Sequence, residues 1–151
     1  EPSAGMIAES QKTVSAVHHQ ASADDMPVES ETFDLLTMGF ALRHVDNLDA
    51  AFQEFHRVLK PGGRALIMDV TRPGTAMGQF WFRLYFKHIL PFLSLVSTGD
   101  RESHRLMKYY WDTMDQMIPR EAVIEIFEDA GFRNVEHHVV AGCFSEYRAE
   151  R

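Results

Sequence analysis

The spacing of apolar residues along the 151-residue chain predicts several helices. Apolar positions recur every three to four residues, which places them on one face of a helix. One such helix follows Asp46 or Asn47, either of which can cap it. Another starts at Pro119, where the missing N–H costs nothing, and ends at Gly131. Further helices are predicted over residues 3–17, 74–97 and 106–117.

Shorter runs with other patterns predict strands. The run from Ala65 to Met68 is unbroken, which is typical of a parallel strand buried on both faces. The predicted strands cover residues 18–21, 33–38, 65–70, 135–141 and 144–148. Helices alternate with strands in the first half, and two neighbouring strands end the chain. This order predicts an α/β three-layer sandwich with a mostly parallel sheet and a C-terminal antiparallel strand pair.

The most informative stretch joins a predicted helix to the strand that ends at Asp69. Its turn is Lys60-Pro61-Gly62-Gly63, in which proline stops the helix and glycine can take the positive φ of a sharp reversal. Ligands of a doubly wound sheet bind beyond the carboxyl ends of its strands. Asp69 lies at such an end, where it can orient a substrate hydroxyl or act as a base. Capping of a neighbouring loop is the alternative role.

Composition narrows the classes of protein that fit. Hydrophobic residues make up 45% of the chain, which is enough for one domain with a sizeable core. The net charge of −7 argues against nucleic acid as a partner, because phosphate binding needs clustered Lys and Arg. The single cysteine, Cys143, excludes an internal disulfide. The eight histidines do not cluster at ligand spacing, so no metal site is expected.

Three sequence motifs carry a resemblance to a known family. Residues 57–63 read Arg-Val-Leu-Lys-Pro-Gly-Gly, an apolar strand follows, and residues 129–132 read Asp-Ala-Gly-Phe. The chain resembles the class I S-adenosylmethionine (SAM)-dependent methyltransferases, in particular the ubiquinone/menaquinone-biosynthesis C-methyltransferase family. The resemblance covers essentially the whole chain and implies a Rossmann-like fold with SAM as cofactor. It further implies methyl transfer to a hydrophobic small molecule, with C-methylation of a quinone precursor as one option.

The resemblance also implies which residues hold SAM. Residues 1–7 look like the segment after the family's second strand, where Glu1 falls on the acid that binds the ribose hydroxyls. Residues 21–27 look like the loop that receives the adenine, with Ser22 in place of the usual aspartate. Residues 33–45 are similar to the fourth strand and the loop after it. The implied cofactor-binding residues are Glu1, Pro2, Met6, Ser22, Ala23, Met38 and Gly39.

Two neighbouring residues lie where substrate and sulfonium meet in this resemblance. Arg43 could pin an acidic or enolate oxygen of the substrate, and His44 could accept a proton. A purely structural histidine is the alternative for His44. With Asp69 they form the set of candidate catalytic residues.

Aromatic residues gather in residues 74–117, a helical insert between a strand and a helix. We expect it to form the acceptor pocket or a lid, because such inserts typically carry function, while core packing is the alternative. The candidate pocket residues are Phe82, Tyr85, Tyr110 and Trp111. Arg83 and Lys87, four residues apart, make one helix face basic, which suits anionic lipid. We expect a cytoplasmic protein, with contact at a membrane surface and a homo-oligomer both left open.

One feature of the family is missing from the sequence. Class I methyltransferases hold SAM chiefly at a glycine-rich loop between the first strand and the first helix, and this chain contains no such loop. We therefore expect residues 1–151 to be the C-terminal part of a single methyltransferase domain, lacking the first strand and helix of the family fold. The alternative is a non-catalytic methyltransferase-like fragment or partner protein that cannot bind SAM alone.

Overall fold

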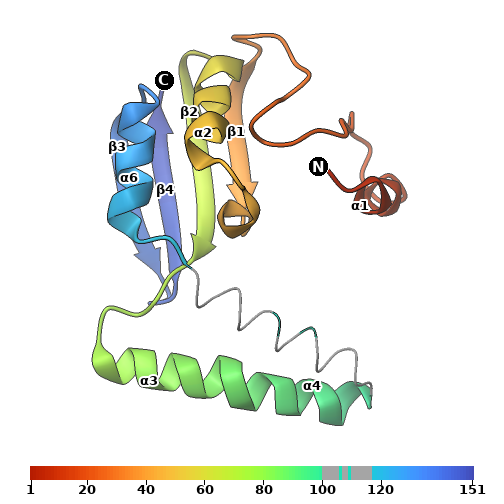
Figure 1. The fold of residues 1–151 in the computed structure, drawn as a ribbon, viewed down its shortest axis with the longest axis vertical. Coiled ribbons are helices and arrows are strands. Elements are labelled where there is room, and N and C mark those ends of the chain that lie inside the picture. The colour runs from red at the N-terminus through yellow and green to blue at the C-terminus, as the bar shows by residue number, and fades with distance from the viewer. Residues whose placement is uncertain (100–105, 107–108, 110–116) are drawn as a thin grey trace.

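The computed structural model describes residues 1–99, 106, 109 and 117–151. The elements in chain order are α1 (Ala4–Ser10), β1 (Phe33–Gly39), the 3-10 turn η1 (Leu42–His44), α2 (Leu48–Val58), β2 (Leu59–Val70), α3 (Ala76–Leu84), the π-helical turn η2 (Tyr85–Ile89), α4 (Leu90–Thr98), α6 (Arg120–Asp129), β3 (Arg133–Val140) and β4 (Phe144–Glu150). Within these residues, the strands form a single sheet in the order β1-β2-β4-β3 (Figure 1).

The sheet confirms the predicted α/β class and the antiparallel pair at the end of the chain. Strands β1 and β2 run parallel, joined by α2, while β4 pairs antiparallel with both β2 and β3. Among the described strands one pairing is therefore parallel and two are antiparallel. The expectation of a mostly parallel sheet is corrected to a mixed one, because β4 inserts between β2 and β3 in the reverse direction.

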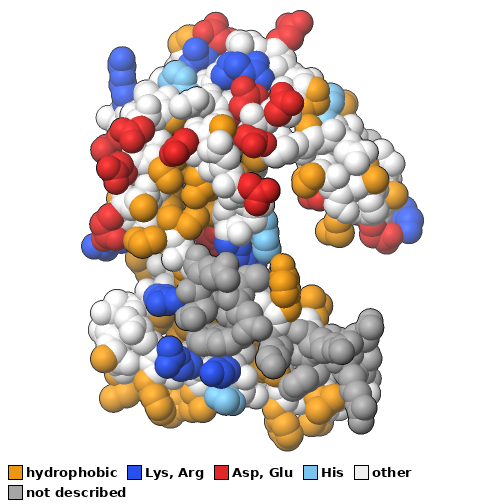
Figure 2. Space-filling view, viewed as in Figure 1, with side chains coloured by type: hydrophobic (Ala, Val, Ile, Leu, Met, Phe, Trp, Pro, Cys, Tyr) orange, Lys and Arg blue, Asp and Glu red, His pale blue; other side chains and the backbone are white. Residues whose placement is uncertain are grey.

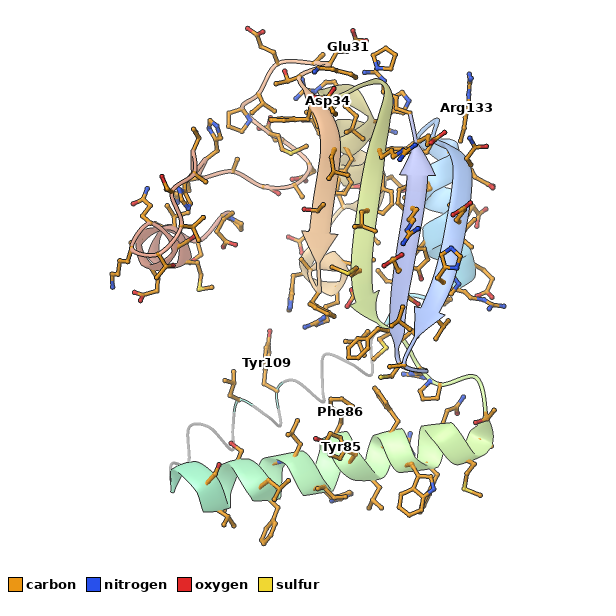
Figure 3. All side chains as sticks on the ribbon, turned by 180° about the vertical axis from the view of Figure 1, so that it is seen from behind. Glu31, Asp34, Tyr85, Phe86, Tyr109 and Arg133 are labelled. Atoms are coloured by element: carbon orange, nitrogen blue, oxygen red, sulfur yellow. The ribbon has the colours of Figure 1, made fainter. Side chains whose placement is uncertain are left out.

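The core lies between the sheet and two helices on the same face, α2 and α6 (Figures 1 and 3). Phe127 of α6 is fully buried and packs edge-on against Phe52 of α2, with ring centroids 4.6 Å apart. Ala65 and Ile67 of β2 point into this core. On the opposite face, Leu35 of β1 is 57% exposed. In the described part of the chain, helices thus cover one face of the sheet, so it shows two of the three expected layers.

The first part of the chain departs most from the predictions. The helix predicted over residues 3–17 ends at Ser10, and no residue of it is buried. A short helix without a packed face gains little from being extended, because most helix stability in proteins comes from tertiary contacts. The strand predicted over residues 18–21 is absent from the sheet. This segment instead exchanges two backbone hydrogen bonds with Glu1, through His19 and Ala21, each 3.3 Å long.

The Lys60–Gly63 turn falls inside the bounds of β2 as an irregularity in its pairing. Phe33 pairs with Leu59 and Leu35 with Arg64, so the extra residues bulge out between two paired positions. Gly62 has a φ of +79°, which is the positive φ predicted for this turn. The backbone N–H of Gly62 donates to the carbonyl oxygen of Arg151, so the turn is tied to the end of the chain.

A helical segment made of α3, η2 and α4 lies beyond the carboxyl ends of β1 and β2 (Figure 1). It confirms the helix predicted over residues 74–97, with small differences at its ends. Most of the helix predicted over residues 106–117 lies outside the described residues. Among the helices that the structure does describe, none combines the length and apolar content needed to cross a membrane.

Candidate functional site

A cavity of about 870 Å³ opens between the N-terminal segment and the first strand of the sheet. Its volume is within the range of 300–1,000 Å³ that is usual for small-molecule sites. Strand β1 and the loop after it form one side, and residues before β1 form the other. The lining residues are Glu1, Pro2, His19, Ala21, Ser22, Ala23, Met26, Pro27, Val28, Phe33, Leu36, Thr37, Met38, Ala41, His44, Val45, Asp46 and Phe55.

The cavity combines apolar and polar surfaces in a way that suits a nucleoside. Met26, Val28 and Leu36 offer apolar surface that an aromatic base can pack against. Carboxylates of Glu1 and Asp46 can accept hydrogen bonds from ribose hydroxyls or attract a positive charge. These apolar side chains and carboxylates therefore fit the adenosine and the sulfonium of SAM.

Five of the seven predicted cofactor-binding residues line this cavity: Glu1, Pro2, Ser22, Ala23 and Met38. The carboxylate of Glu1 accepts a hydrogen bond from the backbone N–H of Ser3, at 3.0 Å. The hydroxyl of Ser22 donates to the carboxylate of Asp24. Met6 and Gly39 are not among the lining residues, and Met6 is 62% exposed on α1.

Arg43 and Asp69, two of the predicted catalytic residues, form an ion pair that lies outside the large cavity. Nη1 of Arg43 lies 3.1 Å from Oδ1 of Asp69, and the two side chains are only 7% and 12% exposed. The same carboxylate oxygen accepts the backbone N–H of Val70 at 2.7 Å. The pair lies in a small crevice of about 20 Å³, on the side of β2 that α6 covers. Asp69 thus faces a buried cation, as expected for a carboxylate taken out of water.

His44 points to the other cavity, although it follows Arg43 directly. Both residues belong to the short turn η1, where successive side chains diverge. The His44 side chain lines the large cavity beside Asp46, while Arg43 lines the crevice with Asp69. The structure therefore brings Arg43 and Asp69 together but does not bring His44 to them.

Three polar residues of β3 and β4 were not predicted from the sequence: Ser145 and Tyr147 are buried, and His137 is half-buried. Tyr147 lines the crevice with Asp69 and is 3% exposed. Burial raises the pKa of its hydroxyl, and the nearby negative charge of Asp69 acts in the same direction. Oγ of Ser145 lies 2.8 Å from Nε2 of His137, whose ring stacks on Tyr147 with centroids 4.8 Å apart. The signal was available, because Ser145 and Tyr147 alternate along the last strand and so share its buried face.

No group of three or more His, Cys, Asp or Glu residues in the described ranges is arranged to hold a metal ion. Two of the histidines instead contact serine hydroxyls: Nε2 of His18 lies 3.0 Å from Oγ of Ser10, and Nε2 of His137 lies 2.8 Å from Oγ of Ser145.

Two of the four predicted acceptor-pocket residues, Phe82 and Tyr85, lie on the helical segment beyond the sheet. Phe82 and Tyr85 each contact Phe86, with ring centroids 4.6 and 5.2 Å apart, and Figure 3 shows Phe86 on the side that faces the sheet. Neither Phe82 nor Tyr85 lines the two cavities described above. Tyr110 and Trp111 lie outside the described residues.

The fold is that of SAM-dependent methyltransferases. A solved SAM-dependent methyltransferase from Thermotoga maritima is 19% identical in sequence and superposes with a TM-score of 0.67, over 99% of this chain and 70% of the other. A second, from Archaeoglobus fulgidus, is 12% identical with a TM-score of 0.66, over 100% of this chain and 74% of the other. At this level of identity the likeness concerns the fold alone.

Sequence similarity then shows the family. Residues 4–148 match the ubiE/COQ5 methyltransferase family, and the chain belongs to that family. It is 34% identical over 124 residues to a ubiquinone/menaquinone biosynthesis C-methyltransferase of Syntrophotalea carbinolica, which covers 82% of this chain and 50% of the relative. It is also 34% identical over 115 residues to a mitochondrial 2-methoxy-6-polyprenyl-1,4-benzoquinol methylase of Pongo abelii, covering 76% of this chain and 34% of the relative. The chain thus spans half or less of the length of these relatives.

Proposed function

We propose that this chain is part of a SAM-dependent methyltransferase that methylates a ring carbon of a hydrophobic quinone precursor. The observation that carries the proposal is the cavity of about 870 Å³ beside β1 and the loop after it, because five residues implied by the family resemblance line it. Membership of the ubiE/COQ5 methyltransferase family supports the same reaction. One relative is named for ubiquinone/menaquinone biosynthesis and the other for methylating 2-methoxy-6-polyprenyl-1,4-benzoquinol, which suggests the class of acceptor.

Within this proposal, residues of the cavity hold SAM by its sugar and its base. The Glu1 carboxylate binds the ribose hydroxyls, and Met26, Val28 and Leu36 pack against the adenine. The Ser22 hydroxyl contacts the edge of the base. When bound, SAM supplies a methyl group on a positively charged sulfur. Asp46, in the loop after β1, adds a negative charge to the cavity, which favours that cation.

His44 is our candidate for the group that takes the proton from the acceptor. Its side chain is exposed to the same cavity, so it can reach a phenolic hydroxyl held there. Loss of that proton makes the neighbouring ring carbon more nucleophilic. Arg43 acts as a positioning residue in this scheme, because its buried pair with Asp69 anchors the turn η1 that carries His44. Phe82 of α3 and Phe86 of η2, which are both half-buried, form one wall of the acceptor pocket.

Calorimetric titration with SAM tests the cofactor assignment. We expect binding by a chain extended upstream to include a glycine-rich loop, and much weaker binding by residues 1–151 alone. In the extended chain, Glu1→Gln should weaken SAM binding about tenfold, because a charged hydrogen-bond acceptor is lost. Glu9→Gln is the matched control, since Glu9 is exposed on α1 and outside the cavity. Failure of both chains to bind SAM would contradict the proposal.

Methyl transfer is measured on the extended chain, with labelled SAM and a short-chain analogue of 2-methoxy-6-polyprenyl-1,4-benzoquinol. We expect His44→Gln to reduce kcat about a hundredfold while SAM binding is kept, which is the usual size of a general-base contribution. SAM binding without transfer to any quinol would instead favour a non-catalytic partner protein.

A further inference from the structure

The outward side of the helical segment α3–η2–α4 exposes an unusual amount of apolar surface. Met77, Phe80, Trp81, Phe92 and Val96 are each between 58% and 68% exposed. Figure 2 shows groups of hydrophobic side chains along the outer edge of the molecule, over this segment. Single exposed apolar residues are ordinary on protein surfaces, but several large ones on one helical segment mark an interaction site.

The charge of this region is opposite to that of the rest of the chain. Between Val70 and Gly99 the sequence contains no Asp or Glu, although the whole chain has 22 of them and a net charge of −7. The same stretch contains Arg72, Arg83 and Lys87. Figure 2 shows blue side chains gathered near this segment, while the red ones lie over the sheet and its helices. The segment is therefore cationic and apolar on a chain that is otherwise acidic.

These two properties together match one kind of partner. A helix with tryptophan, phenylalanine and leucine on one side and lysine and arginine beside them lies in the plane of a membrane surface. Trp81 and Tyr85 have an apolar ring and a polar atom, and such side chains prefer the level of the lipid headgroups. The long side chains of Arg83 and Lys87 can reach anionic headgroups while their stems remain against apolar surface.

We propose that the outward side of α3–η2–α4 binds an anionic lipid bilayer, lying along its surface without crossing it. The apolar side chains enter the headgroup region, and the basic residues contact lipid phosphates. The acidic sheet and its helices then lie on the far side of the segment, away from the negative surface, as their charge requires. This inference concerns lipid binding and does not depend on methyl transfer.

Co-sedimentation with vesicles tests the proposal on the 151-residue chain. We expect binding to vesicles of phosphatidylcholine with about one-third phosphatidylglycerol, weak binding to pure phosphatidylcholine, and loss of binding at high salt. Replacing Trp81 and Phe92 together by Ser should lower the partition coefficient at least about tenfold, because two exposed aromatic anchors are removed. Replacing Arg83 and Lys87 together by Glu should abolish the preference for the anionic vesicles.

Two matched variants separate this surface from general effects. Leu35→Ser removes an apolar residue that is 57% exposed on the open face of the sheet, and Arg133→Glu reverses a charge at the opposite end of the molecule (Figure 3). Both should bind the vesicles like the unchanged chain. Circular dichroism checks that each variant is folded. Equal binding to neutral and anionic vesicles would overturn the proposal. So would unchanged binding by the Trp81/Phe92 variant, or a self-association that this variant loses while vesicles do not bind.

Discussion

The sheet with its two helices and the segment α3–η2–α4 use similar apolar residues in opposite ways. In the first region, Phe52, Phe127 and Ile67 are at most 1% exposed and contact one another across α2, α6 and β2. In the second region, α3 and η2 bury no residue at all. Apolar content alone therefore does not decide burial. What differs is whether a complementary face lies within reach, and in the described residues only the sheet provides one.

The largest expected effect comes from removing a ring from each region. Phe127→Ala should lower the free energy of unfolding by about 3–5 kcal/mol, because it leaves a cavity among Phe52, Phe132 and Tyr147. Phe92→Ala, at a side chain that is 63% exposed, should change it by less than about 0.5 kcal/mol. Urea unfolding of the two variants measures the difference. Equal losses would mean that the helical segment is packed as tightly as the core.

A smaller effect is expected from the buried ion pair at the edge of the core. Arg43→Met should cost about 3 kcal/mol, because it leaves the Asp69 carboxylate buried without its cation. The double variant Arg43→Met, Asp69→Leu should recover much of this loss, since no charge is then left behind. Lys12→Gln removes an exposed pair with Glu9 and should cost less than about 1 kcal/mol. If the double variant is as unstable as Arg43→Met, the loss of stability does not come from the unpaired carboxylate, which would contradict this explanation.

The smallest effect concerns the pH dependence of the core. Burial lowers the pKa of His137, and the nearby positive charge of Arg120 acts in the same direction. The folded protein therefore binds this proton less readily than the unfolded chain, whose histidine pKa is about 6.5. The free energy of unfolding should fall as the pH drops below that value, because the unfolded state then takes up the proton first.

His137→Gln should flatten this dependence, since the amide cannot titrate but can still bond Oγ of Ser145. Urea midpoints at about pH 7.5 and about pH 5.5 measure the slope for both proteins. His56, whose pKa burial also lowers, should contribute to the slope that remains. An identical slope in both proteins would contradict a contribution from His137.

The regular elements of the core were predictable because local pattern and tertiary environment agree there. The apolar spacing of residues 48–59 predicted α2, whose bounds are Leu48–Val58, and the unbroken run at Ala65 predicted β2. The expectation that this run is buried on both faces was wrong, because Ala65 and Ile67 are buried on the helix-covered face while Met68 is exposed on the other. Near the N-terminus the two disagree. Residues 18–21 were predicted as a strand but pair with no strand in the described structure, so they remain irregular. A strand needs a partner that its own sequence does not contain.

The sequence predicted which elements carry the three candidate catalytic residues, but not how their side chains are grouped. Asp69 was expected at the end of a buried strand, and Arg43 and His44 in the loop after another, and all three lie there. That Arg43 turns to Asp69 while His44 turns to the large cavity depends on the 3-10 turn that separates them. Tyr147 lines the same crevice as Arg43 and Asp69, although it follows Arg43 by 104 residues in the sequence. The pairing of β4 with β2 brings it there.

By itself the sequence therefore determined the family, the α/β class and the elements that carry the candidate residues, because motifs, caps and apolar spacing are local properties. The tertiary structure decided which face of the sheet is covered, how the strands pair and which side chains meet. Those features depend on contacts between residues distant in the chain, and such contacts form only when complementary surfaces come together. The outward face of α3–η2–α4 shows the same division: its spacing predicted a helix, and only the fold left that face exposed.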